Sequence, residues 1–173
     1  MTEAVKKRIM FASVDDFYFL TYAILIALDA LGCRKDRYLK DYRKLGFLIE
    51  FTTDERLLSI LEYPTQKALN RVDREHLFKS YTSGLGRRSE VLKILFRLEK
   101  SGLVILRKGD AHSLVDVSLS SDVPDGFFDK AIFTQEYSNA SRLSVAVKQL
   151  TRLTLSTALS KIYQVRGIKM WDI

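Results

Sequence analysis

The chain has 173 residues, of which 47% are hydrophobic, and its formal net charge is +7 at pH 7. This length and composition allow a core to form without metal ions or disulfide bonds, so the chain is predicted to be one domain, or two small ones that share a core. Two prolines, eight glycines and no repeat argue against a long linker. The positive charge favours an anionic partner, either nucleic acid or an acidic protein surface.

The single cysteine, Cys33, has no partner for an internal disulfide, which suits a reducing compartment. The basic start of the chain is not followed by the apolar stretch of a secretory signal, because Asp15 and Asp16 interrupt it. Residues 17–28 are mostly apolar, yet Asp29 ends this run well short of the roughly 20 residues that span a bilayer. We therefore expect a cytoplasmic protein with no membrane partner.

Residues 1–65 are predicted to be a helical region. Ser13 is the expected N-cap of a helix that runs to Gly32 and is apolar almost all round, so it should be enclosed by other elements. A second helix is expected over residues 35–49, although the apolar block within 45–51 also fits a short strand. Asp54 is the expected cap of a third, short helix that stops before Pro64.

Residues 66–120 have the pattern of a winged-helix unit. Apolar residues recur at helical spacing over residues 88–100 and leave a basic outer face, and Ser101-Gly102-Leu103 is typical of a helix that ends on a left-handed glycine. Two apolar strands joined by a short glycine-containing basic turn predict a β-hairpin, the wing. Residues 74–81, which precede Thr82-Ser83-Gly84, are expected to supply the first helix of a helix-turn-helix.

Residues 121–173 are predicted to be a loop and a long helix that pack on the same core. Four large apolar residues, at positions 127, 128, 132 and 133, are expected to join the core rather than meet a partner. The long helix should cover residues 141–165. The predicted fold class is therefore mainly α with a small β-hairpin wing, a helical bundle that contains a winged-helix unit.

Two basic surfaces are candidate binding sites. The first, for nucleic acid or an acidic partner, lies on the helix and wing and consists of Arg87, Arg88, Lys93, Arg97, Arg107 and Lys108. The second, for docking a partner, lies in the C-terminal region and consists of Arg142, Lys148, Arg152, Lys161, Arg166 and Trp171. An acidic surface of the chain itself, such as Asp15, Asp16 and Asp29, is an alternative counterpart for the second set.

Catalytic motifs are missing from the sequence. It contains neither a phosphate-binding GxxxxGK[ST] loop nor a GxGxxG motif, and His76, His112 and Cys33 do not have the spacing of metal ligands. No nucleophile and base can be paired from the sequence. We therefore expect no enzymatic activity, no metal, no cofactor and no small-molecule substrate.

Five short segments together resemble the middle component of bacterial three-component ABC-ATPase defence systems, in particular the small middle subunit of Lamassu-type anti-phage and anti-plasmid systems. They are DY at 41–42, KLGFLIEF at 44–51, LFKSY at 77–81, LEKSGLV at 98–104 and GIKMW at 167–171. These are structural apolar and turn positions rather than a catalytic signature.

The resemblance implies a non-catalytic subunit that binds an SMC-like coiled-coil ATPase and helps to connect it to an effector nuclease, with DNA held by the complex. Two other classes stay open. A free-standing winged-helix transcription regulator predicts a symmetric dimer and a palindromic target. A small antitoxin-like or inhibitor-like protein predicts one tight acidic partner and no DNA.

Overall fold

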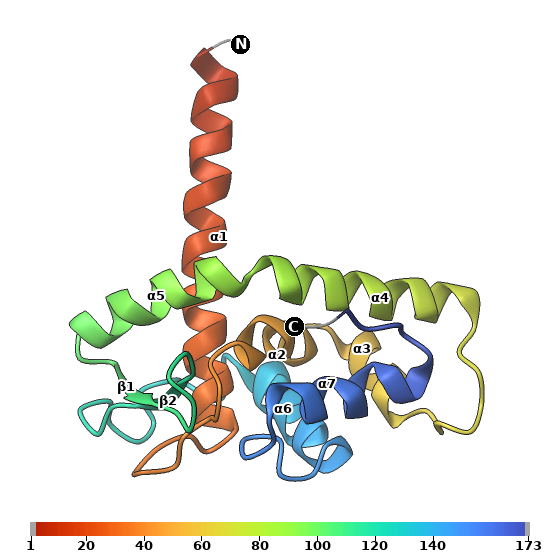
Figure 1. The fold of residues 1–173 in the computed structure, drawn as a ribbon. Helices are drawn as coiled ribbons and strands as arrows, with labels where there is room; N and C mark the ends of the chain where they lie inside the picture. Colours follow the sequence, from red (N-terminus) through yellow and green to blue (C-terminus); the bar gives the residue numbers. More distant parts are fainter. Residues whose placement is uncertain (1–2, 172–173) are drawn as a thin grey trace.

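The computed structural model describes the backbone of residues 3–171 and the side chains of residues 17–171. Within this part of the chain, the protein consists of seven α-helices and one two-stranded antiparallel hairpin (Figure 1), which confirms the predicted mainly α fold with a β-hairpin. The elements are α1 (Glu3–Ala30), α2 (Lys44–Thr53), α3 (Glu55–Glu62), α4 (Arg71–Gly86), α5 (Arg88–Lys100), β1 (Val104–Lys108), β2 (Val115–Leu119), α6 (Thr134–Ala146), α7 (Leu155–Ile162) and the short 3₁₀-helix η1 (Gln164–Arg166).

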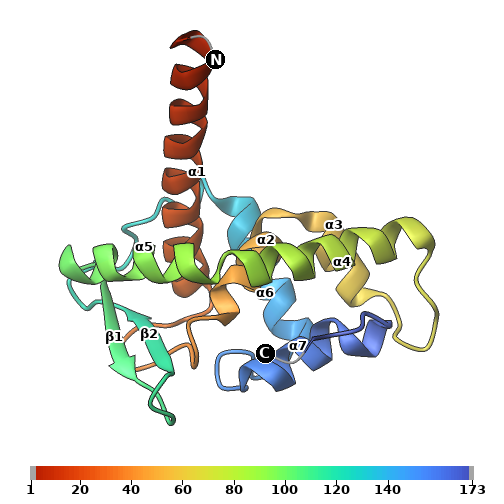
Figure 2. The same ribbon diagram turned by 45° about the horizontal axis from the view of Figure 1, so that its top comes forward.

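Helix α1 differs from the prediction in length and in burial. It contains Ser13 rather than starting there, and its N-terminal half projects from the rest of the molecule (Figures 1 and 2). The side chains of Ser13, Asp15 and Asp16 lie outside the described part. The side chains of residues 23–28 are all buried, so the helix is enclosed on all sides there, as predicted. Tyr18, Phe19 and Tyr22, nearer the projecting half, are exposed, so the prediction is wrong for that part of the helix. Among the described residues, no helix is both long and apolar enough to cross a membrane.

The segment before α2 is irregular, so the helix predicted over residues 35–49 is wrong in its first half. Residues 33–42 lie beside β2 instead. The amide of Leu39 donates to the carbonyl of Val117 at 2.8 Å, and Val117 donates back at 3.1 Å. Tyr42 donates to the carbonyl of Val115 at 2.8 Å. This charged segment lies here because its backbone satisfies the polar groups along the edge of β2 that β1 leaves unpaired.

Helix α3 begins where the sequence predicts. The Asp54 carboxylate accepts hydrogen bonds from the amides of Arg56 and Leu57, at 2.9 and 3.4 Å, and so caps the helix. Tyr63 has extended backbone angles and stops the helix before Pro64. This cap and this stop are both confirmed.

Helices α4 and α5 run end to end, with Arg87 alone between them (Figures 1 and 2). The turn predicted at Thr82-Ser83-Gly84 does not occur, because α4 continues through Gly86. Gly84 has a packing role instead: a Cβ atom at this position would lie 2.2 Å from Cδ1 of Phe47 in α2. Glycine allows α2 and α4 to cross closely, so it does not mark a turn here.

The end of α5 and the hairpin follow the prediction closely. Gly102 has a φ of +76°, and Leu103 donates from its amide to the carbonyl of Leu98 at 2.9 Å, as in a Schellman ending. β1 then pairs antiparallel with β2, with Val104 opposite Leu119 and Lys108 opposite Val115. The connecting turn covers residues 109–114 and is longer than predicted.

The C-terminal region contains two helices rather than the single helix predicted over residues 141–165. Residues 147–154 are not helical, and Thr154 caps α7 by accepting from the amide of Thr157 at 3.2 Å. The buried side chain of Lys44 holds this break open. Its Nζ donates to the carbonyls of Leu150, Thr151 and Leu153 at 2.8, 3.2 and 2.8 Å. A cation from α2 therefore satisfies carbonyls that a continuous helix would have used.

One hydrophobic core joins all three regions of the chain, with buried residues from Leu20 to Ile168. Tyr81 of α4 and Tyr163, the C-cap of α7, meet at its centre with their ring centroids 5.2 Å apart. The four large apolar residues of 121–133 divide between core and surface: Phe128 is buried and Phe133 partly buried, whereas Phe127 and Ile132 are exposed. The prediction that all four join the core is wrong for the last two.

Candidate nucleic-acid and partner interfaces

The outer face of α5 carries both signs of charge. Arg88, Lys93 and Arg97 are exposed, as predicted, but Glu90 and Glu99 are exposed on the same helix. The guanidinium of Arg97 lies 5.0 Å from the ring centroid of Phe17 in α1, which fixes the Arg97 side chain in a cation–π contact. This face therefore attracts a polyanion less strongly than its basic residues alone would suggest.

Arg87 is used inside the fold. Its Nη1 atom lies 2.7 Å from Oε1 of Glu50 in α2, and 28% of the side chain is exposed. Since Arg87 is the only residue between α4 and α5, this ion pair ties their junction to α2. It was predicted as a nucleic-acid contact, but its charge is matched within the protein.

The hairpin presents its basic residues on a strand rather than at its tip. Arg107 and Lys108 belong to β1 and are exposed, whereas the turn carries Asp110, which pairs with Lys40 at 2.8 Å. The Arg107 guanidinium lies 3.9 Å from the ring centroid of Tyr38, and its Nη2 is 3.4 Å from the carboxylate of buried Asp116. Arg107 is thus held in place between a ring and a carboxylate.

Two residues of the second predicted set stabilise the fold. Arg142 pairs with Glu62 at 2.7 Å and with Glu55 at 3.2 Å, and the hydrogen bond with Glu62 raises the pKa of Arg142. Arg166 donates to the carbonyls of Ile60 and Leu61 at the end of α3, and burial lowers its pKa. Both side chains therefore bind elements of their own chain, and Glu55 and Glu62 are the acidic counterparts of Arg142. Of the acidic residues suggested from the sequence, Asp29 pairs with Arg34, and the side chains of Asp15 and Asp16 lie outside the described part.

The remaining residues of the second set are more available. Lys148, Arg152 and Lys161 are exposed, and no ion pair involves them within residues 17–171. Trp171 is 54% exposed. Its ring contacts those of Tyr81 and Phe78 at centroid distances of 5.7 and 6.3 Å, and its amide donates to the Tyr81 hydroxyl at 3.0 Å. The tryptophan is therefore docked on α4 along one side only.

The structure brings together two residues that the sequence assigned to different surfaces. Arg107 of the hairpin and Arg152 of the break before α7 line the same pocket, which has a volume of about 480 Å³. Arg37 and Lys40, from the irregular segment beside β2, line it too. Neither was singled out from the sequence, because the path of residues 33–42 depends on pairing with a strand more than 70 positions away.

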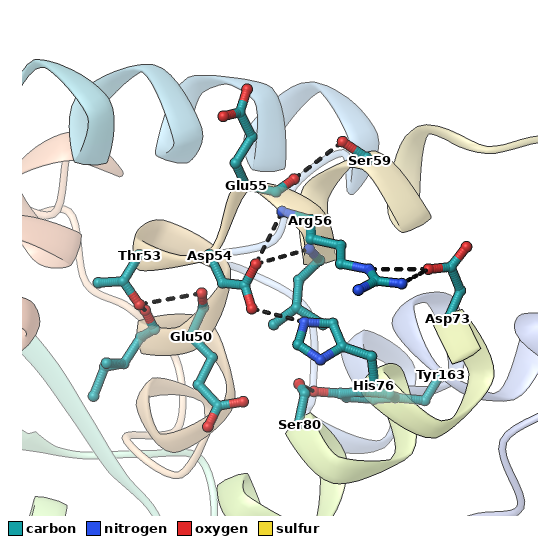
Figure 3. A network of polar contacts seen from close by, with 12 residues as sticks. Glu50, Thr53, Asp54, Glu55, Arg56, Ser59, Asp73, His76, Ser80 and Tyr163 are labelled. Carbon is teal, nitrogen blue, oxygen red and sulfur yellow. Dashed lines mark hydrogen bonds and ion pairs between the residues drawn. The ribbon is translucent and has the colours of Figure 1, made fainter.

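A polar network joins α2, α3 and α4 (Figure 3). Oδ2 of Asp54, the cap of α3, accepts a hydrogen bond from Nε2 of His76 at 2.7 Å, and Arg56 pairs with Asp73 at 3.0 Å. A histidine beside a carboxylate is half of a nucleophile-activating arrangement. The hydroxyl of Ser80, however, is buried and bonded to the Tyr163 hydroxyl at 2.8 Å. The network therefore holds the helices together, a role that sequence spacing alone did not reveal.

The described residues contain no group of three or more histidine, cysteine or acidic side chains suited to a metal ion. His76 and Cys33 both have structural roles: His76 binds Asp54, the cap of α3, and Cys33 is buried in the core with 1% of its surface exposed. Burial raises the pKa of the Cys33 thiol to about 12, which makes the thiolate scarce at neutral pH.

An aromatic surface on α1 was missed by the sequence prediction. Tyr18, Phe19 and Tyr22 are 58%, 54% and 53% exposed, and they directly precede the buried residues 23–28 of α1. We call these three residues the α1 aromatic surface. Their apolar character suggested the core, and only the packing of α1 on α2 and α6 shows which side of the helix stays uncovered.

No family model matches this chain, and the comparisons with curated proteins and with solved structures give no match either. Two surfaces of the described residues are candidate interfaces, the α1 aromatic surface and the exposed basic residues of α5 and the hairpin.

Proposed function

We propose that this chain is a non-catalytic adaptor subunit of a bacterial antiviral or anti-plasmid defence complex. It binds an SMC-like ATPase and links that ATPase to a nuclease effector. The observation that carries the proposal is the α1 aromatic surface, because three large aromatic side chains that are more than half exposed on one helix are typical of a protein-binding site.

The shape of α1 supports a helical partner. The N-terminal half of the helix projects from the body, which leaves room for another helix beside it (Figure 2). Two helices bury most area when the side chains of one fill the grooves of the other, and aromatic residues supply much of the binding energy in such contacts. The coiled coil of an SMC-like ATPase offers a helical surface of this kind.

DNA contact is the second part of the proposal. Arg88, Lys93 and Lys108 are exposed and form no ion pair among the described residues, so they are available to phosphate groups. The neighbouring Glu90 and Glu99 weaken this attraction. The adaptor therefore contacts DNA that the complex holds, rather than capturing DNA alone.

A free-standing winged-helix regulator is the alternative function. The order of α5, β1 and β2 favours it, because a helix followed directly by a hairpin is the order found in such readers. The end-to-end arrangement of α4 and α5 argues against it, since a helix-turn-helix reader needs two helices at an angle.

Two measurements on the purified chain distinguish the adaptor from the regulator. Light scattering gives the molecular mass, and fluorescence anisotropy gives the affinity for DNA. The adaptor proposal expects weak binding without sequence preference, with a Kd of about 10⁻⁶ M or weaker at physiological salt. A symmetric dimer that binds a palindromic site at about 10⁻⁸ M or tighter would support the regulator and contradict the adaptor.

A further inference from the structure

The pocket between the irregular segment, the hairpin and the break before α7 has an unusual balance of charge. We call it the basic pocket. Four of its lining side chains are cationic, namely Arg37, Lys40, Arg107 and Arg152, and one is acidic, Asp36. Another pocket beside it, of about 690 Å³, is lined by Lys40, Arg43 and Lys169 but also by Asp41, Asp110 and Asp116, so its charges are balanced. The basic pocket thus has an excess of positive charge that its neighbour lacks.

Two of the four cations already have acidic partners. Lys40 pairs with Asp110 at 2.8 Å, and Arg107 lies 3.4 Å from Asp116. The side chains of Arg37 and Arg152 are exposed, and neither forms an ion pair within residues 17–171. These two guanidinium groups are therefore available, and a guanidinium matches the oxygens of a phosphate group in pairs.

The walls of the basic pocket are fixed by the fold. The backbone amide of Lys40 donates to the carbonyl of Thr151 at 2.9 Å, and Lys44 Nζ donates to the same carbonyl at 3.2 Å. These bonds hold the segment that carries Arg37 against the segment that carries Arg152. Arg107 is held on the third side by the ring of Tyr38. The backbone that carries Arg37 and Arg152 is thus fixed and the Arg107 side chain is already positioned, so the site loses less entropy when it binds a ligand.

We propose that the basic pocket binds a phosphate group, with Arg37 and Arg152 as its principal ligands and Arg107 as a positioned third cation. A volume of about 480 Å³ lies within the range of small-molecule pockets, so a nucleotide or a phosphate of a nucleic-acid strand can enter. The two sources share this chemistry. The site is distinct from the α1 aromatic surface, so it can be tested apart from the adaptor function.

The test compares the wild-type chain with the double variant Arg37→Glu/Arg152→Glu. The matched control is Lys148→Glu/Lys161→Glu, which changes the net charge equally at exposed residues outside the pocket lining. Binding of a labelled single-stranded oligonucleotide without terminal phosphates is measured by anisotropy over a salt series. Binding of pyrophosphate is measured by calorimetry. Circular dichroism checks that all variants keep their helices.

The pocket variant should bind the oligonucleotide at least about tenfold more weakly than the control does. Its slope of log K against log salt should fall by roughly 0.7 for each phosphate group that the variant no longer neutralises. Loss of pyrophosphate binding alone would identify a free phosphate compound as the ligand and still support the site. Equal losses in the two variants would show diffuse electrostatic attraction and overturn the proposal. So would a wild-type chain that binds neither probe saturably.

Discussion

Gly46 of α2 and Gly84 of α4 face each other where the two helices cross. A Cβ atom at Gly46 would lie 2.9 Å from the carbonyl oxygen of Gly84, and one at Gly84 would lie 2.2 Å from the Phe47 ring. The crossing brings Glu50 of α2 within reach of Arg87, which lies between α4 and α5. Two glycines therefore set the position of the long α4–α5 arm relative to the core.

Replacing Gly84 by alanine should destabilise the protein. The added methyl group overlaps the Phe47 ring, and overpacking of this kind costs about 1–3 kcal/mol of unfolding free energy. Gly86→Ala is the matched control, since a Cβ at that position of the same helix meets no atom within 4 Å. It should be neutral or stabilise by up to about 1 kcal/mol. Urea unfolding measures both, and equal effects would contradict the close crossing.

Removing the cap of α3 should also lower stability. Asp54→Ala deletes the acceptor for two backbone amides and the partner of His76, with an expected loss of about 1–2 kcal/mol. Asp54→Asn keeps an oxygen that can accept from the same amides, so it should lose less than half as much. Thermal and urea unfolding of the two variants provide the comparison. A full loss in Asp54→Asn would mean that the carboxylate charge, not the cap, supplies the stability.

Lys44 should give the stability a distinctive pH dependence. Burial lowers the pKa of Lys44 from 10.5 to about 8, whereas in the unfolded chain the ordinary value applies. Between these values the unfolded state binds more protons than the folded state, so stability from this residue rises with pH, with a slope of at most about 1.4 kcal/mol per pH unit. Below pH 8 the contribution is constant.

The measurement is the difference in unfolding free energy between the wild-type chain and Lys44→Met from pH 7 to pH 9. This difference should grow in favour of the wild type above pH 8. The range stops at pH 9, the ordinary pKa of a cysteine thiol. Above pH 9 the unfolded chain loses the Cys33 proton, whereas the folded protein keeps it because burial raises the pKa of Cys33 to about 12, so Cys33 itself lowers the stability as the pH rises. A difference that stays flat across the range would contradict the pKa shift of Lys44.

Cys33 should resist thiol reagents in the folded protein. It is 1% exposed and its raised pKa leaves little thiolate, so its reaction with Ellman's reagent at pH 8 should be at least about 100-fold slower than in the urea-unfolded chain. The chain has no other cysteine, so the signal has a single source. Equal rates in the folded and unfolded protein would contradict the burial of this side chain.

The features that the sequence predicted correctly depend on neighbouring residues. The cap at Asp54 uses amides two and three positions away, and the stop at Gly102 uses a carbonyl at Leu98. The short apolar runs and the glycine-containing turn that predict β1 and β2 are equally local. Such signals can be recognised in the sequence because the atoms involved are close together in the chain.

The features that the sequence did not predict depend on distant contacts. Residues 33–42 leave helical geometry to bond with β2, and the C-terminal helix is interrupted where Lys44 reaches the carbonyls of Leu150 and Leu153. The basic pocket exists only because both of these segments meet the hairpin. Likewise, the apolar pattern of α1 could not show which of its sides the other helices leave uncovered.

The central claim, that this chain joins an ATPase to an effector through α1, is tested most directly by affinity purification of the tagged chain from its native cell. The extract is treated with a promiscuous nuclease, and the eluted proteins are identified by mass spectrometry. The triple variant Tyr18→Ala/Phe19→Ala/Tyr22→Ala is compared with Phe127→Ala/Ile132→Ala, which removes exposed apolar residues elsewhere.

The adaptor account predicts that a large coiled-coil ATPase and a nuclease elute with the wild-type chain and with the control after the DNA is destroyed, and that the triple variant loses the ATPase. If the wild-type chain elutes alone, or as a self-dimer whose only partner was nucleic acid, the adaptor account is contradicted and the regulator takes its place.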